Sequence, residues 1–96
     1  MTFALGPDVL LQRVGSGAVL LQARTGQYYE LNDSGADLLQ FVLETQDVET
    51  ALNRMQDTYA AARDDLAADL KVLFADLKEA GLLLFDAEQL NVEDQG

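Results

Sequence analysis

The stretch GQYYELNDSG at residues 26–35 decides how this chain folds, because its two halves obey different local rules. Gly26 suits a turn, and residues 27–31 are rich in aromatic side chains that favour a strand. Residues 32–34 are Asn, Asp and Ser, whose side-chain oxygens accept hydrogen bonds from the free N–H groups at a helix start. The stretch therefore predicts a strand that leads directly into a helix.

Two further strand-like segments precede this stretch. Residues 9–14 (VLLQRV) and 18–23 (AVLLQA) are short apolar runs, separated by Gly15-Ser16-Gly17. Glycine accepts a positive φ at no steric cost, so this tripeptide predicts a tight turn. Three short strands joined by turns that contain glycine predict a small antiparallel sheet.

The apolar residues after Asn32 recur with a helical period. The pattern predicts a first helix over residues 34–43 and a second helix that Asp47 caps and that extends to Tyr59. A third helix is expected from about Arg63 to Ala80, with Gly81 just after its end. Leu82–Phe85 is expected to form a short closing strand or to pack under the sheet.

This order predicts an α+β fold of the winged helix-turn-helix type, with a three-stranded antiparallel sheet followed by three helices. The 96 residues are 49% apolar, which is enough for one modest core. We expect one domain over residues 1–86 and a disordered acidic tail over residues 87–96.

Composition excludes several functions. The chain has no Cys and no His, so it lacks the usual ligands of zinc and haem and the commonest general base. We expect no cofactor, no metal and no enzymatic activity. The net charge of −11 disfavours nucleic acid and anionic membranes. No apolar run is long enough to cross a membrane and the first residues do not read as a signal peptide, so we expect a cytoplasmic protein. Because the sequence also shows no catalytic residue set, we expect it to bind another polypeptide.

The strand at residues 27–31 is a candidate edge for a guest chain. An edge strand leaves a row of N–H and C=O groups unpaired. Tyr28 and Tyr29 point to opposite faces, so one can enter the core while the other contacts a guest. The alternative is that both tyrosines only fill the core.

The third helix carries a second candidate surface. Asp65, Asp69, Asp76 and Glu79 lie one or two turns apart, and Val72 lies off the main apolar stripe. These residues could form the rim and floor of a groove that favours Lys or Arg in a guest peptide. The alternative is an ordinary solvated helix face.

Other functions remain open on residues alone. Asp33-Ser34-Gly35 is similar to the Asp-Ser-Leu of acyl carrier proteins, whose serine carries phosphopantetheine, but strands rather than a helix precede it here. An acidic winged-helix interaction or regulatory module is another alternative. DNA binding is disfavoured, because the third helix is rich in aspartate.

Three blocks of sequence resemble the PqqD-like family, the leader-recognition domains of ribosomally made and modified peptides. They are GQYYELNDSGADLL, DVETALNRMQDTY and DLKVLFADLKEAGLL, in this order within about residues 18–84. The form VLLQARTGQYYELN is most similar to the stand-alone recognition proteins of lasso-peptide pathways.

The resemblance implies that a precursor leader peptide adds as a strand beside the third strand and against the third helix. It also implies a separate modifying enzyme, which in lasso pathways is a leader peptidase. The implied peptide-binding residues are Gln27, Tyr28, Tyr29, Glu30, Leu31, Asp65, Leu66, Asp69, Leu70, Val72, Leu73 and Asp76.

Overall fold

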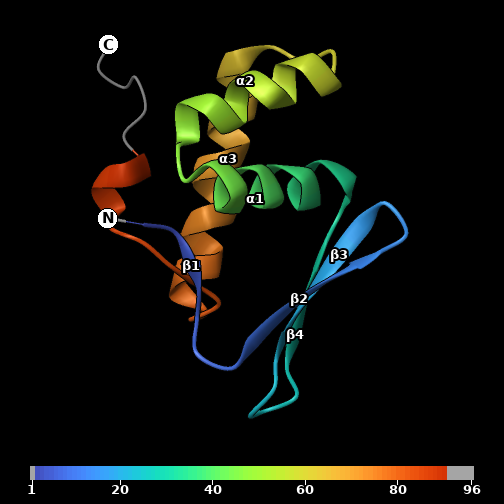
Figure 1. Cartoon of the computed structure of the whole chain (residues 1–96), viewed down its shortest axis with the longest axis vertical. Coiled ribbons are helices and arrows are strands. Elements are labelled where there is room, and N and C mark those ends of the chain that lie inside the picture. Colours follow the sequence, from blue (N-terminus) through green and yellow to red (C-terminus); the bar gives the residue numbers. More distant parts are fainter. Residues whose placement is uncertain (1, 91–96) are drawn as a thin grey trace.

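The computed structural model describes residues 2–90, and its architecture is an α+β fold in which a small antiparallel sheet precedes three helices (Figure 1). The α+β prediction is therefore confirmed. In chain order the elements are β1 (Ala4–Leu5), β2 (Val9–Val14), β3 (Gly17–Gln22), β4 (Tyr28–Leu31), α1 (Asp33–Thr45), α2 (Val48–Thr58), α3 (Arg63–Glu79), β5 (Leu83–Leu84) and the short 3-10 helix η1 (Ala87–Leu90).

The main sheet has the order β2-β3-β4, with both neighbouring pairs antiparallel. Val14 pairs with Gly17, so the first turn consists of Gly15 and Ser16, and Gly15 has a φ of 62°. Strand β4 pairs with β3 on one side and lies at an edge of the sheet in the described part of the chain. The predicted three-stranded sheet and its edge strand are confirmed.

The helices begin where the capping residues predict. The Asn32 side chain accepts a hydrogen bond of 2.9 Å from the Gly35 N–H at the start of α1, and Asp47 accepts one of 3.1 Å from Thr50 N–H at the start of α2. Helix α1 extends two residues beyond the predicted end. It stops at Gln46, which adopts a left-handed conformation with a φ of 58°.

A second, two-stranded sheet was not expected. Residues Leu83–Leu84 do form the short closing strand, but their partner is Ala4–Leu5 rather than the main sheet. The pairing places Phe3 against Phe74 and Phe85, with ring centroids 6.0 and 5.3 Å from that of Phe3. Strand β1 has only two residues, too few for an alternating pattern to identify it as a strand from the sequence.

The first four residues of the expected tail are part of the described structure. Residues 87–90 form η1, and Leu90 packs partly against the core. The remainder of the expected tail, residues 91–96, lies outside the described residues.

The core lies between the sheet and the helices. Ala18, Leu20 and Leu31 point from the inner face of the sheet and are almost fully buried. Helix α1 packs against them, and α2 and α3 pack against α1 and extend the core, so that Leu39, Leu52 and Phe74 are 0% exposed. The outer face of the sheet is uncovered in the described structure, and Leu10, Val14 and Tyr28 are exposed there. The functional surface is therefore to be sought where the edge strand β4 meets the helices.

Candidate functional site

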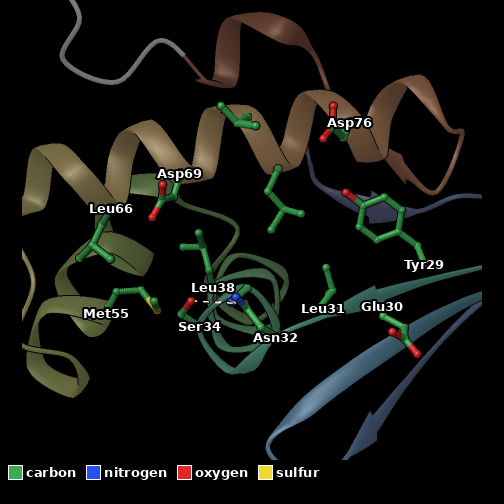
Figure 2. Close-up of a pocket in the computed structure, with 13 residues that line it drawn as sticks. Tyr29, Glu30, Leu31, Asn32, Ser34, Leu38, Met55, Leu66, Asp69 and Asp76 are labelled. Carbon is green, nitrogen blue, oxygen red and sulfur yellow. Dashed lines mark hydrogen bonds between the residues drawn. The ribbon is translucent and has the colours of Figure 1, made fainter.

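A groove of about 720 Å³ lies between the edge strand β4 and helix α3 (Figure 2). The first turn of α1 closes its middle, and Met55 of α2 closes one end. The lining residues are Tyr29, Glu30, Leu31, Asn32, Ser34, Gly35, Leu38, Met55, Leu66, Asp69, Val72, Leu73 and Asp76.

The backbone of β4 presents free hydrogen-bonding groups to this groove. Gln22 N–H donates to Gln27 O, and Ala23 N–H donates to Asp8 O, so even-numbered residues of β3 bond toward β4 and odd-numbered ones toward β2. Tyr29 and Leu31, which lie opposite Leu20 and Ala18, therefore bond to β3. The N–H and C=O groups of Tyr28 and Glu30 point to the open edge.

The side chains that enter the groove belong to the other residues of β4, those whose backbone groups bond to β3. Tyr29 and Leu31 point toward helix α3 and enter the groove, whereas the Glu30 side chain points away from it (Figure 2). Glu30 thus contributes its backbone to the groove rather than its carboxylate. The strand offers alternating backbone groups and apolar surface, which is the arrangement that an added strand requires.

Apolar side chains form the floor of the groove. Leu38, Met55 and Leu66 are at most 5% exposed, so they are fixed by the core and form a preformed surface. Leu73 is partly buried, and Val72 is 65% exposed at the rim. A guest side chain placed here would therefore be removed from water on several sides.

Most of the expected peptide-binding residues line the groove, but four of them do not. Asp65 lies outside the groove lining, and Leu70 is 0% exposed within the core. Gln27 and Tyr28 line a side pocket of about 390 Å³ instead. That side pocket shares Tyr29 with the groove and is completed by Gln22, Gly26, Ala80 and Leu82.

Sequence reasoning missed five lining residues, Asn32, Ser34, Gly35, Leu38 and Met55. The first three follow β4 without a break, so their position beside the groove could have been inferred from the strand-to-helix junction. Leu38 lies one turn further along α1. Met55 carries no such signal, because its position depends on how α2 packs against α3.

A polar network fixes the sheet against α1 and α2. The Asp37 carboxylate accepts a hydrogen bond of 2.6 Å from the Tyr59 hydroxyl and one of 3.0 Å from the Arg13 guanidinium. The same guanidinium donates hydrogen bonds to the backbone oxygens of Ser16 and Gly17. The hydrogen bond to Asp37, aided by burial and by the negative charge of Asp37, raises the pKa of Tyr59 to about 12. The network therefore holds a neutral tyrosine and an ion pair side by side.

The described residues offer no metal site, since they hold no cluster of three or more His, Cys, Asp or Glu side chains that could bind an ion. None of the helices described is both long and apolar enough to cross a membrane. Ser34 lies in the first turn of α1 directly after a strand, not after a helix as in an acyl carrier protein. The arrangement favours the binding of an extended chain.

The fold and the groove define a winged helix-turn-helix-like domain with an open sheet edge beside a helix. The chain belongs to the PqqD family: the family model described as coenzyme PQQ synthesis protein D matches residues 17–83. The resemblance stated from the sequence is thereby confirmed. No curated protein matches the sequence significantly.

Two solved structures are similar to this chain over most of its length. One, described as lasso peptide synthetase B1 complexed with the leader peptide, has a TM-score of 0.78 and 30% identity and covers 88% of this chain and 100% of that chain. The other, described as TbiB1 in complex with the TbiA(beta) leader peptide, has a TM-score of 0.74 and covers 85% of this chain and 98% of that chain. Its identity of 23% supports the fold alone.

Proposed function

We propose that this chain binds the leader segment of a ribosomally synthesised precursor peptide as an added strand along β4. The observation that carries the proposal is the open backbone edge at Tyr28 and Glu30 beside the apolar groove. Membership of the PqqD family supports it, as does the likeness to a lasso peptide synthetase B1 described as complexed with a leader peptide. The likeness favours a lasso-peptide pathway for this chain.

Backbone pairing alone cannot give useful affinity. The four free groups of Tyr28 and Glu30 would contribute a net of roughly 0.5–1.5 kcal/mol each. Association costs on the order of 4–15 kcal/mol, and ordering the leader costs more. Two or three guest side chains must therefore be buried, at roughly 1.5–3 kcal/mol each. The groove floor of Leu38, Met55 and Leu66 provides the surface that buries them.

The domain acts by presentation rather than by catalysis. Without His or Cys it has neither the commonest base nor a thiol nucleophile, so a separate enzyme modifies or cleaves the precursor. In a lasso pathway this enzyme is a leader peptidase. The domain holds the leader, and the part of the precursor to be processed extends beyond the groove.

Hydrogen exchange of the backbone amides tests strand addition at single-residue resolution. The probe is the leader segment of the precursor peptide, synthesised on its own. Leader binding should slow exchange at Tyr28 and Glu30, whose N–H groups point to the open edge. Tyr29 and Leu31 are already bonded to β3 and should change less, so they provide the internal control.

Titration calorimetry with the same leader segment gives the affinity. Binding with unchanged exchange at Tyr28 and Glu30 would contradict strand addition at β4. No measurable binding at a protein concentration of roughly 100 μM would contradict leader recognition itself, since that limit corresponds to about −5.5 kcal/mol.

A further inference from the structure

The aspartates and the lysines of helix α3 lie on different sides of the helix. At 100° per residue, Asp65, Asp69 and Asp76 lie within about 40° of one another around the helix axis. Lys71 and Lys78 lie on roughly the opposite side of the helix from Asp69. Asp69 and Asp76 both line the groove, and in Figure 2 Asp69 projects below α3 while Asp76 lies on the front of the helix above Tyr29. The side of the helix that borders the groove is therefore acidic only.

The carboxylates of the groove have no basic partner within the described residues. Asp69 and Asp76 both line the groove, and no Lys or Arg does so in the described part of the chain. The four arginines pair elsewhere, with Asp37, Asp8, Glu44 and Glu49. The Lys78 ammonium donates to Phe85 O. The groove thus combines an apolar floor with two carboxylates whose charges are not balanced locally.

We propose that the groove selects an extended segment with one apolar residue flanked, two positions away on each side, by lysine or arginine. This inference rests on the proposed function and specifies the chemistry of the guest. The apolar residue lies against Val72 and Leu73, which stand between Asp69 and Asp76 in sequence, and each basic side chain reaches one carboxylate. Opposite charges across the groove would set both register and preference.

The spacing fits the geometry of an added strand. Asp76 lies seven positions after Asp69 in the α-helix, which is a rise of about 10.5 Å along the helix axis. Side chains on one face of a strand recur about every 6.8 Å, so the first and fifth residues of a guest are about 13.6 Å apart. The flexible stems of lysine and arginine accommodate the small difference. The motif reads the same in both directions, so it does not depend on the orientation of the guest.

A displayed library of random ten-residue peptides, selected on the full chain at low ionic strength, tests the preference without knowledge of the natural leader. The wild-type protein should enrich peptides with the basic–x–apolar–x–basic pattern. The double variant Asp69→Lys/Asp76→Lys should lose this pattern and enrich acidic flanking residues. The double variant Asp57→Lys/Asp64→Lys has the same change in net charge outside the groove lining and should still enrich basic residues.

Selected peptides then give a quantitative measure. Replacing one flanking lysine by glutamine should lower affinity about two- to fivefold, the range for one exposed ion pair. The difference should shrink at roughly 0.5 M salt, where exposed charges are screened.

Three outcomes would count against the inference in distinguishable ways. Enriched peptides that are apolar but show no charge preference would refute the basic flanks and leave strand addition standing. Enrichment of the same basic pattern by the Asp69→Lys/Asp76→Lys variant would place the acidic contact elsewhere. A selection that enriches no peptide at all would count against the proposed function as well.

Discussion

The Tyr59 hydroxyl donates a hydrogen bond of 2.6 Å to Asp37 Oδ2, and this contact joins the end of α2 to α1. Asp37 Oδ1 accepts from Arg13 on β2 at 3.0 Å, so three elements meet at one carboxylate. The groove is built on α1, α2, α3 and β4. The network therefore helps to fix the walls of the groove relative to one another.

Replacing Tyr59 by phenylalanine should change how stability depends on pH. The folded state raises the pKa of Tyr59 from 10.0 to about 12, so the folded protein holds the phenolic proton more tightly than the unfolded chain. This stabilisation is fully present below pH 10 and is lost as the pH rises from 10 to 12. Urea unfolding of wild type and Tyr59→Phe from pH 8 to 12 should show a difference in free energy of unfolding that shrinks above pH 10.

Tyr28→Phe is the matched control for this measurement, because the Tyr28 hydroxyl has no hydrogen-bond partner in the described structure. It removes the same hydroxyl group without removing a hydrogen bond to a carboxylate, so it measures the effect of losing a tyrosine hydroxyl alone. A Tyr59→Phe difference that stayed constant from pH 8 to 12 would mean that the Asp37 hydrogen bond does not govern the titration of Tyr59.

Val72→Glu should weaken leader binding and leave the fold intact. Val72 is 65% exposed at the rim of the groove, so the change in free energy of unfolding should stay within about 0.5 kcal/mol. The loss of one buried apolar contact, worth about 1.5–3 kcal/mol, predicts an affinity roughly 10- to 150-fold lower by calorimetry.

Val14→Glu provides the control, since Val14 is 58% exposed on the outer face of the sheet. The same substitution there should leave leader affinity unchanged. Equal losses at the two positions would indicate a general effect of charge, and no loss at Val72 would exclude this rim from the binding surface.

Leu70→Ala should destabilise the fold rather than act on a guest. Leu70 is 0% exposed, and such a truncation typically costs 2–5 kcal/mol. Thermal unfolding should show a large decrease in Tm, while Val72→Ala on the same helix should change Tm little. A Leu70→Ala protein with wild-type Tm and reduced leader affinity would contradict this prediction and indicate that Leu70 contacts the leader.

Gly35→Ala should separate binding from stability. A Cβ at this position would lie 3.6 Å from Leu73 Cδ2 and 3.1 Å from the Asn32 Oδ1 that caps α1. Alanine favours the helix, whereas crowding of the cap opposes it, so the net change in free energy of unfolding should be within about 1 kcal/mol. The added methyl narrows the groove between α1 and α3, and leader affinity should fall. Unchanged affinity by calorimetry would show that the guest does not approach the first turn of α1.

The sequence was sufficient for the elements that depend on local chemistry. Asn32 and Asp47 cap the helices that they were expected to cap, and the turn at Gly15 joins the expected strands. Strand β4 was identified as an edge because no further strand-like segment follows it directly. These features depend on residues close in sequence, whose conformational preferences can be recognised without knowledge of the fold.

Features that depend on contacts distant in sequence were not predictable. Strand β1 forms because Ala4 and Leu5 pair with Leu84 and Leu83, which lie about 80 residues later in the chain. The helical period placed Leu66 and Leu70 on one apolar face, yet only the packing of the whole fold determines that Leu66 lines the groove while Leu70 is fully buried. The same holds for Tyr28, which alternation assigns to one of two faces without saying which face a guest would use.

The pairing of β1 with β5 has a practical consequence for engineering. Leu5 lies opposite Leu83, so the backbone enters and leaves the three-helix unit through two adjacent strands. A host protein would need only two neighbouring attachment points to receive residues 3–85, which include the buried Phe3 and Phe85, as an inserted module. Such a graft would leave the segment from Val9 to Glu79 continuous, and with it every residue that lines the groove.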